Sequence, residues 1–286
     1  MGSNAYINYM KRLTSQQQAE MISLYTTGII KNTRELDKKY GIYPGSCYNV
    51  LKRKALIKYS NADVHKLFNE DYFENINTEK QAYFLGLLAA DGNVSNKRNT
   101  ISLSLNVDDG LDLIEEFKKE LNSTGSIKIY TDKRTDYKRK SMVTIQFTSQ
   151  KTKEDLQKIG LGPKKTTNLA YPKINKELDK HFIRGFIDGD GSFYYKRGIL
   201  VFCLVGTEEI LKSIQSILNK ELHIKYTKLT KHITGVYYLR LGHKDTLKLR
   251  TWIYNDCNIA MKRKKLYTYR IDNEDPNYLS ALRAAK

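Results

Sequence analysis

Two stretches of the sequence end in an acid where an acid is unfavourable. FLGLLAADG at residues 84–92 and IRGFIDGDG at 183–191 have the apolar pattern of a helix, and each reaches an aspartate, Asp91 or Asp190, directly before a glycine. A carboxylate on the last turn faces the negative end of the helix dipole, which costs a few tenths to about 1 kcal/mol. Because these positions are unfavourable for stability, the two acids indicate a functional role.

The spacing of small residues predicts that the two helices pair. Small side chains recur four positions apart in both stretches, at Gly86 with Ala90 and at Gly185 with Gly189. One face of each helix therefore allows close backbone approach. If the helices pair about a pseudo-twofold axis, Asp91 and Asp190 come together, although like charges and two dipoles oppose it. A shared Mg²⁺ would offset this cost, and such a metal activates water for attack on a phosphodiester.

The elements around the acids predict an internal repeat. Each motif stretch is followed by predicted strands, at 101–107, 126–130 and 142–149 in the first copy and at 198–206, 223–229 and 235–242 in the second. Apolar and polar residues alternate along 101–107 and 142–149. Helical patterns fall at 112–121, 151–160, 208–222 and 246–255. Lys165 and Lys264, in two basic clusters, are separated by the same number of residues as the two aspartates. We therefore expect an α+β fold of two αββαββα repeats, over residues 78–170 and 171–272, with a tail at 273–286.

The first 60 residues predict a separate helical module. Three short helices with tight glycine turns resemble a helix-turn-helix, whose last helix would read DNA. In that helix Val50, Leu51 and Ala55 are expected to face inward, and the residues expected to face DNA are Tyr48, Asn49, Lys52 and Arg53. An ordinary helical cap on a larger domain is the alternative. Residues 61–77 are expected to be a linker.

The charge of the chain indicates a polyanionic partner. The 286 residues include 49 Lys and Arg against 31 Asp and Glu, a net charge of +18. A compact domain with this excess repels itself, and nucleic acid is the simplest reason to keep it; a lysine-rich composition from an AT-biased genome is the alternative. No apolar run is long enough to span a membrane, and no signal peptide opens the chain. The cysteines and histidines have no zinc-site spacing, so we expect a reducing cytoplasm and a hard cation.

The two motif stretches resemble the signature helices of LAGLIDADG homing endonucleases of the single-chain, two-repeat type, over about residues 78–270. The resemblance implies a saddle of two antiparallel sheets whose concave face lies in the DNA major groove. It implies that Asp91 and Asp190, with Ala90 and Gly189 beside them, bind two or three Mg²⁺ ions together with DNA. The motif's other acid is Asp188 in the second copy but Ala89 in the first, so Asp188 is assigned a supporting role.

The resemblance also implies catalytic lysines and DNA-contacting strands. Lys165 and Lys264 fit the catalytic role, although Lys164, Lys262 and Lys265 are hardly distinguishable from them by sequence. The polar strand positions that would face bases are Ser102, Ser104, Asn106, Thr144, Gln146, Tyr194, Lys196, Tyr238 and Arg240. The segment 128–140 would grip phosphates through Lys133, Arg134, Lys138 and Arg139. The alternatives are an ordinary solvated sheet face and a solvated loop.

Together these features predict a monomeric, sequence-specific homing endonuclease that makes a Mg²⁺-dependent double-strand break at a long asymmetric site in double-stranded DNA. We expect it in the cytoplasm of a bacterial or phage-infected cell, or in an organelle, without a membrane or protein partner. Two alternatives use the same scaffold: a transcriptional regulator that only binds DNA, and an RNA intron maturase.

Overall fold

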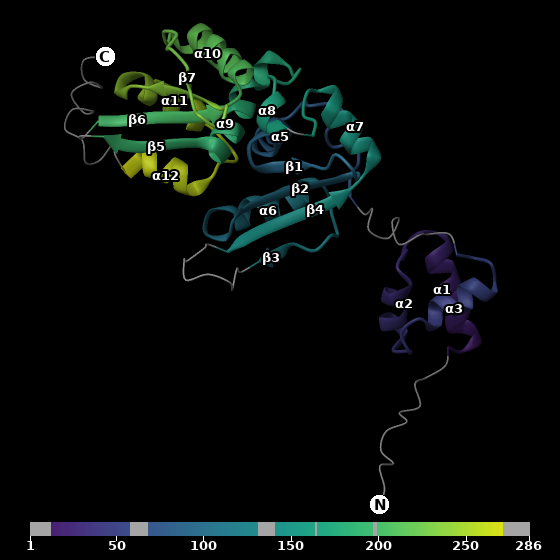
Figure 1. The fold of residues 1–286 in the computed structure, drawn as a ribbon. Helices are drawn as coiled ribbons and strands as arrows, with labels where there is room; N and C mark the ends of the chain where they lie inside the picture. Colours follow the sequence, from purple (N-terminus) through teal and green to yellow (C-terminus); the bar gives the residue numbers. More distant parts are fainter. Residues whose placement is uncertain (1–12, 58–67, 131–140, 164, 197–198, 271–286) are drawn as a thin grey trace, which may run out of the picture. The chain divides into compact units, whose positions relative to one another are not determined.

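The chain divides into two compact units, residues 1–67 and 68–286 (Figure 1). The computed structural model describes residues 13–57, 68–130, 141–163, 165–196 and 199–270. The second unit begins with a buried aromatic segment, because Phe68, Tyr72 and Phe73 lie in its core. It therefore starts earlier than the expected residue 78, and part of the expected 61–77 linker is core. The expected tail at 273–286 lies outside the described residues.

The described part of the first unit, residues 13–57, contains three short helices, α1 (Ser15–Thr26), α2 (Thr33–Tyr40) and α3 (Ser46–Arg53). Thr14 caps the start of α1, and Gly41, whose φ of 61° is left-handed, caps the end of α2. The buried carboxylate of Asp37 accepts hydrogen bonds from the backbone N–H groups of Gly45 (2.6 Å) and Cys47 (2.9 Å), which fixes the start of α3. The small core of this unit consists of Met21, Tyr25, Leu36, Ile42, Cys47 and Leu51.

The second unit consists of two copies of one supersecondary pattern, as predicted. The first copy runs through α5 (Glu79–Asp91), β1 (Gly92–Val94), β2 (Thr100–Asn106), α6 (Val107–Glu120), β3 (Lys128–Tyr130), β4 (Met142–Thr148), α7 (Gln150–Lys158) and α8 (Lys165–Asn168). The second runs through η1 (Lys176–Leu178), α9 (Asp179–Asp190), β5 (Gly191–Lys196), β6 (Ile199–Gly206), α10 (Glu208–Leu222), β7 (Thr230–Lys231), β8 (Tyr237–Leu241), α11 (His243–Tyr254) and α12 (Lys262–Arg270).

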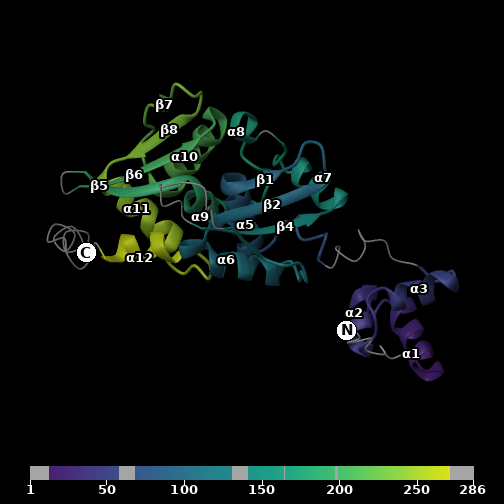
Figure 2. The same cartoon turned by 60° about the horizontal axis from the view of Figure 1, so that its bottom comes forward.

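Each copy forms one antiparallel sheet of four strands. The strand orders, β1-β2-β4-β3 and β5-β6-β8-β7, are equivalent. Helices α5 and α9 lie side by side between the two sheets in both views (Figures 1 and 2). The predicted α+β fold of two αββαββα repeats is therefore confirmed.

One face of each sheet packs on helices. Residues of β2 and β4 alternate between buried and accessible, and the buried set, including Leu103 and Ile145, packs with Ile114 and Phe117 of α6. Helices α10 and α11 cover the corresponding face of the second sheet. The opposite face of each sheet carries the side chains that the alternation predicted to be accessible.

Two local predictions differ from the structure. The expected strand at 223–229 is not part of a ladder, and only Thr230–Lys231 pairs with β8. Side-chain hydrogen bonds hold this segment instead of a backbone ladder: Gln215 of α10 donates to the backbone O of Thr227 (2.7 Å), and the hydroxyl of Thr227 donates to the backbone O of Arg240 in β8 (3.4 Å). Ala55, expected to face inward, is exposed and lies beyond the end of α3 with a φ of 52°.

In the part of the chain that the structure describes, no helix combines the length and the apolar character that a membrane span requires.

Candidate functional site

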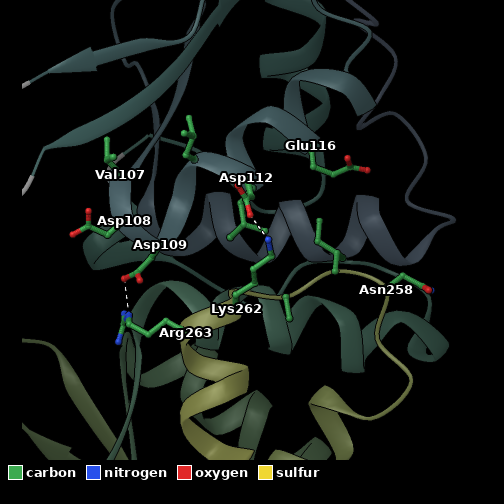
Figure 3. A pocket seen from close by; sticks show the side chains of 12 residues that line it. Val107, Asp108, Asp109, Asp112, Glu116, Asn258, Lys262 and Arg263 are labelled. Carbon is green, nitrogen blue, oxygen red and sulfur yellow. Dashed lines mark hydrogen bonds and ion pairs between the residues drawn. The ribbon is translucent and has the colours of Figure 1, made fainter.

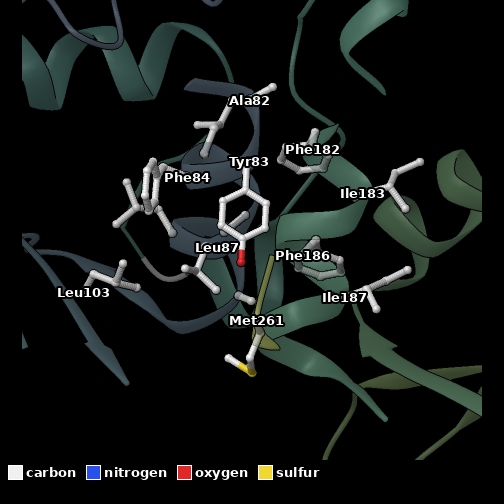
Figure 4. Close-up of a cluster of buried hydrophobic side chains, with 14 of the residues drawn as sticks. Ala82, Tyr83, Phe84, Leu87, Leu103, Phe182, Ile183, Phe186, Ile187 and Met261 are labelled. Carbon is white, nitrogen blue, oxygen red and sulfur yellow. The ribbon is translucent and has the colours of Figure 1, made fainter. Parts of the chain in front are cut away.

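Helices α5 and α9 approach so closely that glycine is required on both. A Cβ atom added to Gly86 would lie 2.1 Å from the backbone O of Phe182, and one added to Gly185 would lie 2.0 Å from that of Tyr83. Real Cβ contacts are ordinarily 3.4 Å or longer. The predicted pairing of the two helices through their small residues is confirmed. Figure 4 shows Tyr83 of α5 beside Phe182 and Phe186 of α9 in the core.

The same approach brings the two helix ends together. An added Cβ on Gly189 would lie 2.2 Å from the Cβ of Ala90 and 2.9 Å from Oδ2 of Asp91. The carboxylate of Asp91 thus lies against the residue that precedes Asp190. Each helix ends at its aspartate, as the residue pattern predicts.

A glycine follows each acid because the chain turns directly from helix into strand. Gly92 and Gly191 are extended, and a Cβ on either would lie 2.5 or 2.6 Å from the carbonyl oxygen of Leu88 or Ile187 in the preceding turn. The strands β1 and β5 therefore start beneath the last turn of their own helix. This geometry fixes the two aspartates at the junction of helix and sheet.

The environment of the acids disfavours their charge. The pKa of Asp190 is raised to about 6: burial contributes most, the nearby carboxylate of Asp91 adds to the rise, and Lys165 and Lys264 oppose both effects. Burial also raises the pKa of Asp91, against the same two lysines. A pair of crowded carboxylates with raised pKa values is typical of a functional site, because a cation or a proton completes it.

One lysine from each repeat reaches the end of its own motif helix. Lys165 Nζ donates to the backbone O of Ala89 (2.8 Å) and to that of Ala90. Lys264 Nζ donates to four backbone oxygens, of Ile187, Asp188, Gly189 and Gly191, at 2.6–3.1 Å. Burial lowers the pKa of both ammonium groups, that of Lys264 to about 8. These two cations offset the negative ends of both helix dipoles.

The geometry distinguishes these lysines from most of the sequence alternatives. Lys262 forms an ion pair with Asp112, and Lys265 Nζ lies 3.3 Å from Sγ of Cys257. Lys164 lies outside the described residues. Of the described lysines that the sequence could not rank, Lys165 and Lys264 are therefore the two that lie beside the acid pair.

Asp188 has a structural environment that differs from that of Asp190. Its buried carboxylate accepts hydrogen bonds from the hydroxyls of Tyr83 (2.8 Å) and Tyr254 (2.7 Å) and from the N–H of Met261 (2.7 Å). In Figure 4 the hydroxyl of Tyr83 points toward Met261. Burial raises the pKa of Asp188, while these donors oppose the rise. Asp188 thereby fixes the segment that leads into α12 and Lys264.

A second buried network, missed by sequence reasoning, holds the same segment. Arg184 is fully buried in α9 and donates to the backbone oxygens of Ile253 (3.1 Å) and Ile259 (2.9 Å) and to Oε1 of Glu79 (2.6 Å). Glu79 in turn accepts from the backbone N–H of Asn258 (2.9 Å). An arginine within an otherwise apolar helical stretch was the available signal.

One pocket is lined by residues other than the acid pair. This pocket, of about 320 Å³, separates α6 from residues 258–263, and two ion pairs lie among the residues that line it (Figure 3). Arg263 Nε lies 2.6 Å from Asp109 Oδ2, and Lys262 pairs with Asp112. Among the described residues no group of three or more His, Cys, Asp or Glu side chains forms a metal-binding cluster. Any ion at Asp91 and Asp190 thus needs oxygen ligands beyond protein carboxylates.

The strand residues predicted to contact DNA lie on the open faces of the sheets. Ser102 pairs with Gln146, and Ser104 with Thr144, whose hydroxyls are 2.8 Å apart. Asn106 also caps α6, since its Oδ1 accepts from the N–H of Asp108 (3.0 Å). On the second sheet the register places Tyr194, Lys196, Tyr238 and Arg240 on one face. Lys133, Arg134, Lys138 and Arg139 lie outside the described residues.

In the first unit, the predicted outward residues of α3 are accessible. Cys47 and Leu51 are buried, whereas Tyr48, Asn49, Lys52 and Arg53 are exposed. Nζ of Lys52 lies 6.0 Å from the ring centroid of Tyr48. The exposed side of α3 is therefore polar and basic.

The fold and the site together define a class of protein: two αββαββα repeats in one chain, paired through their first helices, with an acid at the end of each of these helices. A family model described as "Putative archaeal homing endonuclease" matches residues 69–269. The chain thus belongs to the LAGLIDADG homing endonuclease family, a family of DNA-cleaving nucleases.

Solved structures of DNA-bound meganucleases are similar to this chain at low identity. I-SmaMI bound to uncleaveable DNA is 17% identical, with 71% of this chain and 95% of that chain covered and a TM-score of 0.44. I-AabMI bound to uncleaved DNA is 11% identical, with 71% and 96% covered and a TM-score of 0.41. I-SmaMI with an uncleaved target and calcium ions is 16% identical, with 73% and 97% covered and a TM-score of 0.42. No curated protein matches the sequence.

Proposed function

We propose that the protein is a sequence-specific endonuclease that makes a Mg²⁺-dependent double-strand break at a long asymmetric DNA site. The observation that carries the proposal is the pairing of Asp91 and Asp190 at adjacent helix ends, with one lysine from each repeat beside them. Two equivalent acid–lysine sets in one chain suit the cleavage of two strands by a monomer.

The donor set fits Mg²⁺. The two carboxylates and the backbone oxygens of Ala90 and Gly189 are all hard oxygen donors, which this ion prefers. Both backbone oxygens accept hydrogen bonds from lysine ammonium groups, so this position already attracts cations. We propose that Asp91 and Asp190 hold two or three ions jointly with water and DNA phosphate. When bound, the metal would supply an activated water and stabilise the leaving oxygen.

The chain's own groups would orient and neutralise the scissile phosphates. Each ammonium group, of Lys165 and of Lys264, is fixed by backbone carbonyls within electrostatic reach of both acids. A cation held rigidly beside a phosphate stabilises the negative charge that develops in the transition state. With a pKa of about 8, Lys264 is protonated at neutral pH and can also donate a proton from Nζ. Asp188 and Arg184 would act indirectly, by positioning the segment before Lys264.

The open sheet faces suit a nucleic-acid groove. None of the residues in the eight described strands is acidic, whereas Lys128, Lys196, Lys231 and Arg240 are basic. Because the chain contains 31 acids, their absence from these strands supports contact with a polyanion. Side chains on the faces would read major-groove edges.

The first unit would add a second DNA contact. Its α3 exposes Lys52 and Arg53 beside Tyr48 and Asn49, which suits a helix placed in a groove. Linking two binding surfaces in one chain raises the overall affinity and lengthens the footprint.

The decisive experiment compares cleavage with binding in the Asp190→Asn variant of the full chain. Wild-type protein is incubated with the DNA that flanks its own gene, with Mg²⁺ and with EDTA, and cleavage is expected only with Mg²⁺. Asp190→Asn should abolish cleavage while retaining binding in a gel-shift assay. Asp256→Asn is the matched control, because Asp256 is exposed and its left-handed backbone, with a φ of 56°, tolerates asparagine.

The other outcomes separate the alternatives. If wild-type protein binds but never cleaves the DNA, the chain is a DNA-binding regulator. If it binds the RNA transcript of the flanking element and promotes its splicing, the chain is a maturase. If Asp190→Asn removes binding as strongly as cleavage, the role of Asp190 in a metal site is wrong.

A further inference from the structure

The open face of the second sheet has an apolar central strand. Along β6 the buried residues Leu200, Phe202 and Leu204 alternate with a row on the opposite face. That row consists of Ile199, Val201, Cys203 and Val205, which are half-buried or exposed, and Ile199 is 51% exposed. A row of apolar side chains on an open face indicates a binding surface.

The equivalent strand of the first sheet has the same shape but different chemistry. Gly92 pairs with Leu103, and Gly191 pairs with Leu204, so the two registers can be superimposed. The register aligns Thr100 with Val201, Ser102 with Cys203, and Ser104 with Val205. Valine is threonine with a methyl group in place of the hydroxyl, and cysteine is serine with a sulfur in place of the oxygen. The two repeats therefore present matched surfaces, one able to form hydrogen bonds and the other largely apolar.

Basic residues surround the apolar row. Lys196 on β5, Lys231 on β7 and Arg240 on β8 are exposed, and the strands of this sheet contain no acid. The guanidinium of Arg240 lies 4.7 Å from the ring centroid of Tyr238 on the same face. A second copy of this chain docked here would face these basic residues with its own. A polyanion that displays methyl groups fits better, and thymine displays its C5 methyl in the major groove.

We propose that Val201, Cys203 and Val205 read thymine methyl groups in the half of the DNA site that lies against the second repeat. This inference rests on the proposed DNA-cleaving function. Alternate residues of a strand are about 6.7 Å apart, roughly two base-pair steps. The half-site under β6 therefore carries thymines at alternate base pairs, whereas the half-site under β2 is read by hydroxyl and amide groups.

The first test removes only the methyl groups. Full-length Asp190→Asn protein selects duplexes from a randomised pool, and the selected duplex is resynthesised with deoxyuridine for thymidine in one half or the other. Binding should weaken about fourfold for each contacted methyl group. Burying one methyl group contributes about 0.8 kcal/mol, and about 1.4 kcal/mol corresponds to a tenfold change in affinity. Only the duplex substituted in the half-site that lies against the second repeat should bind more weakly. Equal affinity of both substituted duplexes and the parent would overturn the inference.

The second test gives the open face of β6 the hydroxyl groups that β2 has. A variant with Val201→Ser, Cys203→Ser and Val205→Ser, in which each side chain carries a hydroxyl and no methyl group, should lose the sensitivity to deoxyuridine, while thermal unfolding checks that it remains folded. The matched control, Thr100→Val with Ser102→Cys, changes the equivalent positions of β2 and should leave that sensitivity intact. If the triple variant unfolds, the comparison of deoxyuridine duplexes with the parent protein still tests the inference.

Two further outcomes are distinguishable. If light scattering shows a wild-type dimer that the triple variant dissociates, the apolar row is a self-association surface and the inference is wrong. If no duplex is selected from the pool, sequence-specific DNA binding itself fails, and the proposed function fails with it. Selection of a duplex that does not respond to deoxyuridine rejects the methyl readout alone.

Discussion

Replacing Asp190 with asparagine should stabilise the free protein at neutral pH, although it should abolish cleavage. The pKa of Asp190 is raised from an ordinary value of 3.8 to about 6. A raised pKa means that the charged carboxylate costs folding free energy. This cost is absent below about pH 4 and complete above about pH 6. The wild type should therefore lose stability relative to Asp190→Asn as the pH rises through this window.

The magnitude follows from the shift and the exposure of the side chain. About two pKa units at about 1.4 kcal/mol each give an upper value of about 3 kcal/mol. More than a third of Asp190 remains accessible to solvent, although protein atoms crowd its carboxylate. Solvent screening reduces the cost, and we expect about 1 kcal/mol at pH 7.5.

The assay is urea unfolding of both proteins with EDTA at pH 4, 5, 6 and 7.5. Asp188→Asn provides the opposite expectation from a residue two positions away. Its carboxylate accepts from three donors, and an amide nitrogen would face at least one of them, so about 1–3 kcal/mol of stability should be lost. The reasoning is refuted if Asp190→Asn is no more stable than wild type at pH 7.5, or if its advantage persists at pH 4.

Three further predictions follow from the contacts in both units. Gly185→Ala should lower the free energy of unfolding by about 1–3 kcal/mol or more and impair cleavage, because the added Cβ would lie 2.0 Å from the backbone O of Tyr83. Gly162→Ala is the control: its added Cβ would lie 3.8 Å from the nearest atom, so it should be neutral in the same melting and cleavage assays. Lys165→Met should produce a nicked product on strand-labelled DNA, because Lys264 and its four carbonyl contacts remain; loss of both cuts would contradict separate lysine roles. Lys52→Ala should weaken DNA binding and reduce its salt dependence by about one counterion, and an unchanged slope would exclude Lys52 from the interface.

The sequence predicted the parts of the site that depend on local pattern. The helix pairing, the strand alternation and the position of the acids all follow from residue spacing, so Gly86, Gly185, Asp91 and Asp190 could be placed in advance. The supporting networks could not, because their partners are far apart in sequence. Arg184, for example, is held by Glu79 and by two carbonyls of the second repeat.

Other residues were uncertain because one side chain can serve two purposes. Asn106 ends β2 on the open face, yet its side chain also caps α6, which alternation alone does not indicate. The segment 223–229 has the composition of a strand, but a strand also needs a neighbour that pairs with its backbone. Here the side chains of Gln215 and Thr227 form the hydrogen bonds instead. Such outcomes depend on tertiary neighbours and not on local propensity.

The two repeats agree at the ends of their motif helices and differ on the open faces of their sheets. Both retain an acid, a following glycine and a lysine at the helix end, the features that phosphodiester chemistry on either strand would require. They differ at Asp188 and Ala89, which lie behind the site, and along β2 and β6, which would face the bases. Two identical subunits related by a twofold axis must present the same face to both half-sites. A single chain with two repeats has no such constraint, so its two sheets can diverge to fit an asymmetric sequence while the site between them keeps its symmetry.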